Sequence, residues 1–161
     1  MYNDFIAAEK ELRKMSVIKS KRLESTMEFL DTMKKIHKEV ISLCMRCPKR
    51  WDRFLTGDIA HLANMAMIRT KRGNSIYPTT QEEVQLRRNE FINATADLRG
   101  LISMLGNLFD YAVDSGEYGI KSSRMESIML LIETEINLLR GLMRKDAARY
   151  KTLPTRAQKQ K

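Results

Sequence analysis

Proline and glycine are scarce in this sequence, which has three prolines and seven glycines among its 161 residues. Most of them fall between or beyond stretches with helical periodicity, where such residues end helices. No stretch alternates apolar and polar residues in the way that predicts a half-buried strand. The sequence therefore predicts an all-α chain with few breaks, and its length fits one domain with residues to spare for tails.

Cysteine is rarer still, since Cys44 and Cys47 are the two residues of this type. Two cysteines three positions apart do not form a disulfide framework, which indicates a reducing compartment. No run of 18 apolar residues occurs, and the opening MYNDFIAAEKELRK lacks the apolar core of a secretory signal. We therefore expect a cytoplasmic protein without a membrane partner.

Motifs of common enzymes are missing as well. The sequence has no glycine-rich phosphate loop, no nucleophile elbow and no paired-carboxylate spacing. Cys44 and Cys47 form a single C-x-x-C on an apolar stripe, which favours buried small hydrophobes over half a metal site. Asp58 and His61 supply half of a di-metal bundle motif, but no second copy follows. We expect no catalytic residues, no metal and no cofactor; an unrecognised helical active site is the alternative.

Acidic residues are the minority among the charged ones. Twenty-nine lysines and arginines face 20 aspartates and glutamates, so the net charge is +9. Such a surplus favours polyanionic partners, nucleic acid first and an anionic membrane surface second. A basic protein with no such partner is the alternative that composition leaves open.

Four segments place apolar residues at three- and four-residue steps, which predicts amphipathic helices. Their ranges are 25–47, 52–72, 81–113 and 123–150. The third is the clearest, because its apolar seam runs from Val84 through Leu98 to Ala112 in heptad-like steps. Together they predict an antiparallel up-down four-helix bundle over residues 25–150.

The stretch NSIYPTTQEE stands before the third helix and has two T-x-x-E spacings, Thr79 with Glu82 and Thr80 with Glu83. In a capping box the hydroxyl accepts from an early backbone N–H, and the carboxylate reaches back. The stretch therefore predicts a doubly specified helix start. Ser123 and Glu126 predict a further capping box at the fourth helix.

The two ends of the chain differ from the bundle in composition. Residues 1–24 are predicted to be a basic N-terminal extension, helical and peripheral to the bundle. Residues 151–161 are polar and basic beyond Pro154, which predicts a disordered basic tail.

Three stretches resemble one known family. The helix and stop LDTMKKIHKEVISLCMRCPKRW, the turn and helix RGNSIYPTTQEEVQLRRNEFINATADLRGLISMLGNL, and the last helix SSRMESIMLLIETEINLLRGLMRK follow its order of helices and turns. The family comprises the four-helix-bundle proteins encoded in intervening sequences of bacterial 23S rRNA genes and the accessory variability determinant (Avd) of diversity-generating retroelements. The resemblance covers about residues 25–150.

This resemblance implies a partner and an assembly that composition does not. Family members form a homopentameric ring with a basic surface, so it implies a homo-oligomer, a pentamer. The retroelement members bind RNA and assist a reverse transcriptase in cDNA synthesis, so it implies a structured RNA and a reverse transcriptase as partners. The basic extension and the long tail depart from the family pattern.

Basic residues gather at the predicted turns and helix ends, and these are the candidate nucleic-acid contacts. The candidates are Arg46, Lys49, Arg50, Arg53, Arg69, Lys71, Arg72, Arg87, Arg88, Arg144, Lys145, Arg149 and Lys151. Lysines and arginines that neutralise phosphates release counterions, which gives salt-dependent affinity without base readout. The alternative is that they are solvated helix ends, because the helix dipole favours cations at C-termini.

Two aromatic residues and the methionines have more than one interpretation. Trp51 and Tyr77 flank the basic clusters and could stack on unpaired bases, or plug the ends of the bundle. Eleven methionines, several of them off the main stripes, indicate a second packing face. The sequence thus favours a non-enzymatic protein that binds RNA or DNA. The rivals are a helical protein-interaction adaptor and an rRNA intervening-sequence protein of unknown role.

Overall fold

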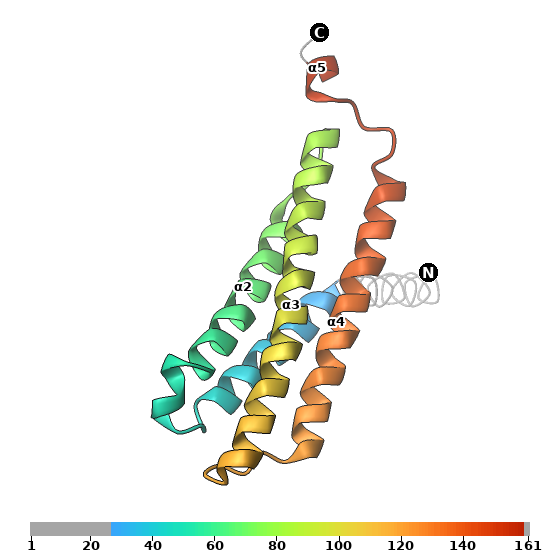
Figure 1. Ribbon diagram of the computed structural model, residues 1–161. Helices are drawn as coiled ribbons and strands as arrows, with labels where there is room; N and C mark the ends of the chain where they lie inside the picture. Colours follow the sequence, from blue (N-terminus) through green and yellow to red (C-terminus); the bar gives the residue numbers. More distant parts are fainter. Residues whose placement is uncertain (1–26, 160–161) are drawn as a thin grey trace, which may run out of the picture.

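The computed structural model describes residues 27–159, and every regular element in that range is helical. A first helix spans residues 27–44. It is followed by η1 (Lys49–Arg53), α2 (Thr56–Ser75), α3 (Gln81–Ser115), α4 (Ser122–Arg149) and α5 (Arg156–Lys159). Figure 1 shows the four long helices side by side in a bundle. The prediction of an all-helical bundle is confirmed, whereas the extension predicted for residues 1–24 lies outside the described residues.

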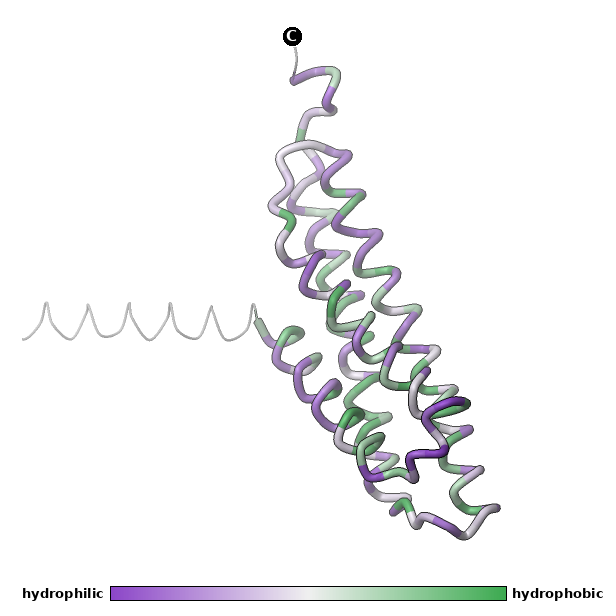
Figure 2. Tube along the Cα trace, turned by 90° about the vertical axis from the view of Figure 1, so that its left-hand side faces the viewer, coloured by the Kyte–Doolittle hydropathy of each residue, from purple (hydrophilic) through white to green (hydrophobic). Residues whose placement is uncertain are grey.

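The core is a continuous apolar seam to which all four long helices contribute. Met33 and Ile36 of the first helix, Ile59 of α2, Leu98 of α3 and Ile132 of α4 are all fully buried. Hydrophobic segments recur turn after turn along the helices in Figure 2. Fully burying one such side chain contributes roughly 1.5–3 kcal/mol, so this seam is the main stabilising feature of the bundle.

The turn after the first helix is closed by an aromatic plug. Trp51 of η1 is completely buried, and its ring lies edge-on against Tyr111 and Tyr118, with centroids 5.0 and 6.4 Å away. A buried ring has no face for a base, so base stacking by Trp51 is excluded and the plug interpretation holds. Tyr77 is 81% exposed, so base stacking by this residue stays a prediction.

The connection between α2 and α3 follows the predicted capping logic. Thr80 is the N-cap of α3 and its hydroxyl accepts from the backbone N–H of Glu83. The Glu83 carboxylate accepts in return from the N–H of Thr79, at 2.7 Å. At the end of α2, Gly73 is required, because a Cβ there would lie 2.6 Å from the Phe91 ring.

The start of α4 differs from its prediction. The helix begins at Ser122, with Lys121 as N-cap and no side-chain hydrogen bond at the cap. The expected capping box of Ser123 and Glu126 does not form, because the N-cap lies two residues earlier, at Lys121, and places Ser123 inside the first turn. The first amides of α4 therefore have no side-chain partner from a cap.

Helix starts and helix ends meet in space. Arg87, near the start of α3, contacts Gly73 at the end of α2 and Asp146 at the end of α4. Arg124, near the start of α4, contacts Glu39, near the end of the first helix. Among residues 27–159, no helix is both long enough and apolar enough to cross a membrane.

The C-terminal segment is held against the start of α3. The Gln81 side-chain amide donates to the carbonyls of Tyr150 and Leu153, at 2.8 and 3.0 Å. The Gln81 backbone N–H donates to Pro154, and Glu82 accepts from the backbone N–H of Arg156. This differs from the disordered tail that the composition predicts. The reason is that exposed donors and acceptors at the start of α3 bind the tail backbone, which composition does not reveal.

Candidate nucleic-acid interface

Arg87 is a structural residue, which corrects its prediction as a nucleic-acid contact. It is 8% exposed, and its Nε donates to Asp146 Oδ2 at 2.6 Å. Its Nη1 donates to the carbonyls of Gly73 and Ile76, both at 2.9 Å. The guanidinium also lies 5.0 Å from the centre of the Phe91 ring. These contacts use most of its donors, so Arg87 joins α2, α3 and α4 and cannot reach a phosphate.

Three other predicted contacts already have carboxylate partners. Arg69 pairs with Asp97 at 2.8 Å, Arg72 pairs with Glu90 at 2.9 Å, and Arg50 pairs with Glu117. Burial raises the pKa of Asp97 even though Arg69 opposes this. Each pair partly cancels the charge that a phosphate would meet, so these three residues are weaker candidates than their sequence positions indicated.

The remaining predicted contacts are exposed but lie at three separate places. Arg46, Lys49 and Arg53 surround the turn after the first helix, and Lys71 lies near the end of α2. The others, on α3, α4 and the segment after it, are Arg88, Arg144, Lys145, Arg149 and Lys151. Only part of the predicted set is therefore brought together.

Several exposed cations line a groove between α3 and α4, which we call the α3–α4 groove. One hollow of about 350 Å³ is lined by Arg88 of α3 and by Arg140 and Arg144 of α4, with Ile92 and Met143 as apolar wall. Within residues 27–159, none of these three arginines lies within ion-pair distance of a carboxylate. Arg140 was not among the predicted contacts; its spacing of four residues from Arg144 is the signal that could have found it.

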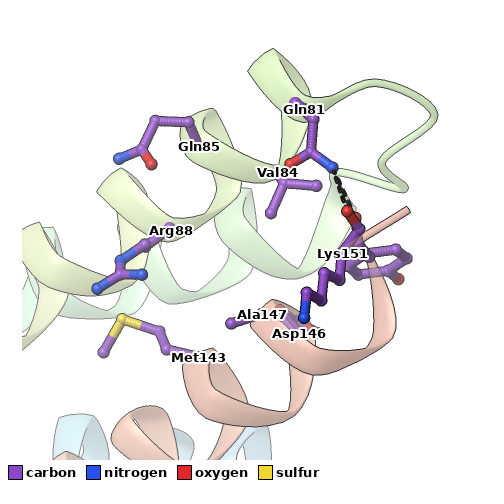
Figure 3. A pocket seen from close by; sticks show the side chains of 9 residues that line it. Gln81, Val84, Gln85, Arg88, Met143, Asp146, Ala147 and Lys151 are labelled. Atoms are coloured by element: carbon purple, nitrogen blue, oxygen red, sulfur yellow. Dashed lines mark hydrogen bonds between the residues drawn. The ribbon is translucent and has the colours of Figure 1, made fainter. Parts of the chain in front are cut away.

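A second hollow, of about 260 Å³, continues the groove toward the C-terminal segment. Figure 3 shows Arg88 extending from α3 toward Met143 of α4, with Lys151 and Gln81 farther along. Asp146 also lines this hollow, but its carboxylate is bound to Arg87. The negative charge of the wall is therefore already neutralised.

The charge of this region is markedly one-sided. Residues 140–159 carry seven lysines and arginines and one acid, Asp146. The apolar side chains of Ile92 and Met143 lie beside cations without carboxylate partners among residues 27–159. Such a surface can bind a polyanion of any sequence, because the cations contact the phosphates and the apolar side chains contact the sugars.

The two cysteines of the C-x-x-C segment lie among packed side chains of the bundle. Cys47 is buried and its thiol donates to the carbonyl of Leu43 at 3.4 Å. Burial, reinforced by Cys47 and Asp52, raises the pKa of Cys44 to about 12. Across the part of the chain that the structure describes, no three His, Cys, Asp or Glu side chains gather as metal ligands do.

Glu135 is an unusual residue that the sequence interpretation missed. It is fully buried in α4, and neither carboxylate oxygen has a hydrogen-bond partner among the described residues. Burial, with a smaller contribution from Glu28, raises its pKa to about 8. Its position between Ile132 and Leu139 in the three-four stripe is the signal that could have predicted its burial, but an acidic residue is not counted in an apolar stripe.

Comparisons with protein-family models, with curated proteins and with solved structures find no match to this chain. The resemblance to the intervening-sequence and retroelement family therefore stays a prediction from the sequence.

Proposed function

We propose that the protein is a non-enzymatic, cytoplasmic nucleic-acid-binding accessory factor whose α3–α4 groove holds a phosphodiester backbone. The observation that supports this is the set Arg88, Arg140 and Arg144, which line one hollow and lack carboxylate partners within residues 27–159. Counterion release by such cations supplies affinity without base readout. Lys151 extends the same wall.

The family resemblance adds the identity of the partners to this proposal. It implies a structured template RNA rather than DNA, a reverse transcriptase that uses it, and a homopentamer of antiparallel up-down bundles. The meeting of helix starts with helix ends supports that topology, because Arg87 and Arg124 each link the start of one helix to the end of another. In this role the protein would hold RNA near the polymerase and perform no chemistry itself.

An interaction adaptor is a second candidate, favoured by partly exposed apolar side chains. Leu86, Ile92 and Leu130 are each about half exposed or more. A helix of another protein could dock on such residues, with the basic charge serving solubility. Salt separates the two functions, because apolar docking does not weaken steeply with salt whereas phosphate contacts do.

The test of the proposed function is a double charge reversal in the groove, Arg88→Glu with Arg140→Glu. Binding of a labelled single-stranded RNA, measured by fluorescence anisotropy at low salt, should fall by about a hundredfold, since two contacts are replaced by repulsion. The matched control is Lys34→Glu with Lys35→Glu, which makes the same charge change on exposed residues of the first helix. Equal losses in both variants, or RNA binding unaffected by the groove reversal, would reject the groove.

A further inference from the structure

A separate basic cavity lies at the opposite end of the bundle from the tail. Its volume is about 590 Å³, and it opens between the end of the first helix and the segment that leads into α4. Lys38 and Arg46 line one side, and Lys121 and Arg124 line the other. Along α3 the two basic sites are separated by roughly 40 Å, from Arg88 to the residues after Ser115, at about 1.5 Å per residue.

The charges of this cavity are not balanced. Four cations face one carboxylate, that of Glu39, which is 3.4 Å from Arg124. Arg124 is also 3.4 Å from the Ser42 hydroxyl, so both of its contacts are long for hydrogen bonds. A guanidinium held this weakly can turn toward a better acceptor, and a phosphate dianion is the acceptor that Arg and Lys donors on two sides would bind best.

The remaining wall of the cavity is apolar and aromatic. Leu43, Tyr118 and Ile120 contribute to it. The Tyr118 ring is already fixed edge-on against buried Trp51, so it loses little freedom when it packs against a ligand. A pocket of this size with an apolar side and clustered cations matches the usual dimensions of small-ligand sites.

We propose that this cavity binds a nucleoside monophosphate group, with the phosphate between Arg46, Lys121 and Arg124 and the base against Tyr118. The group could come from a free nucleotide or from the 5′-phosphorylated end of a nucleic-acid strand. The two sources present the same chemistry to the cavity. The proposal does not rest on the α3–α4 groove, because the two sites share no residue.

The experiment titrates the full chain with adenosine 5′-monophosphate and with adenosine, followed by isothermal calorimetry and two-dimensional NMR. The nucleotide should bind and shift the amide signals of Tyr118 to Arg124, whereas adenosine should bind at least about tenfold more weakly, because charge-assisted contacts are lost. A second pair of probes, a short single-stranded RNA with a 5′-phosphate and the same RNA with a 5′-hydroxyl, shows whether strand ends also enter. Preference for the phosphate in either pair supports the cavity; equal affinities within both pairs, or no binding, overturn it.

Variants locate the binding within the molecule. Arg46→Gln with Lys121→Gln should lower affinity for the nucleotide about tenfold or more. Lys34→Gln with Lys35→Gln removes the same charge outside the cavity and should leave the affinity for the nucleotide unchanged. Circular dichroism should confirm that both variants are folded. The groove reversal Arg88→Glu with Arg140→Glu should also retain nucleotide binding. If the groove reversal removes nucleotide binding and the cavity variant does not, the site is misplaced and the proposal fails even if the groove binds RNA.

Discussion

The position of each basic residue determines whether its charge is exposed to a ligand or buried in the bundle. Arg87 and Arg88 are neighbours with the same formal charge, yet Arg87 is bound to Asp146 inside the bundle and Arg88 is exposed in the groove. The difference comes from the helical period, because successive residues point about 100° apart. Counting charges along the sequence therefore cannot separate structural cations from binding ones.

The buried carboxyl of Glu135 predicts an unusual dependence of stability on pH. Its pKa is raised from 4.5 to about 8 in the folded protein, so the folded state keeps a proton that the unfolded state has lost. The contribution of this group to stability is then greatest below pH 4.5 and decreases as the pH rises to about 8, by roughly 4–5 kcal/mol. Glu28 of the first helix is the charged group that opposes its ionisation.

Glu135→Gln is the variant that checks this dependence. Urea unfolding from acidic to mildly alkaline pH should show a smaller decline in the free energy of unfolding than in the original protein. Glu133→Gln, at an exposed position of the same helix, is the control and should keep the decline. Parallel pH profiles for the original protein and the Glu135 variant would contradict a neutral buried carboxyl.

At the scale of elements, the helices were predictable and their ends were only partly so. The period of Val84, Leu98 and Ala112 predicted α3 because burial of one face dominates helix position. The cap at Thr80 was also predictable, since its partners lie within four residues. The path of the residues after α4 was not, because it depends on Gln81 and Glu82, about 70 residues away in the sequence.

The buried pair of Arg87 and Asp146 predicts a loss of stability at the junction of α2, α3 and α4. Arg87→Ala leaves the Asp146 carboxylate buried without a partner and should lower the free energy of unfolding by roughly 3–5 kcal/mol. Arg87→Met with Asp146→Leu should recover part of this, because apolar residues replace the ion pair, while the carbonyls of Gly73 and Ile76 still lose their donor. Chemical denaturation measures both.

Arg88→Met provides the comparison at the adjacent position. Because Arg88 is exposed and has no carboxylate partner among residues 27–159, its replacement should change stability by less than about 0.5 kcal/mol. It should nevertheless weaken RNA binding. A similar loss of stability in the Arg87 and Arg88 variants would show that burial does not distinguish them.

At the scale of the whole molecule, composition predicted a basic protein but not where the charge would gather. Some of the surplus lies around the turn after the first helix, and some lies along α3, α4 and the segment that follows. Arg140 was missed although its spacing from Arg144 indicates it, and Arg87 was misassigned because its partners lie on α2 and α4. Packing across helices, rather than local sequence, selects the usable cations.

The salt dependence of RNA binding tests this distribution. The magnitude of the slope of log affinity against log salt should decrease by roughly 1.4 when Arg88→Gln and Arg140→Gln remove two phosphate contacts, at about 0.7 per contact on single strands. Lys34→Gln with Lys35→Gln should leave the slope as it is. A slope near zero in the unaltered protein would instead favour the adaptor.

The contacts that hold the C-terminal segment against α3 provide a position for a fluorescent label. Lys159 of α5 donates to the Thr79 hydroxyl at 3.0 Å, so the last described helix is attached beside the entrance of α3. A fluorescent dye on a cysteine introduced at Ala157 would sit near the groove and far from the nucleotide-sized cavity. Energy transfer from that dye to a labelled ligand would therefore report which end of the bundle the ligand occupies.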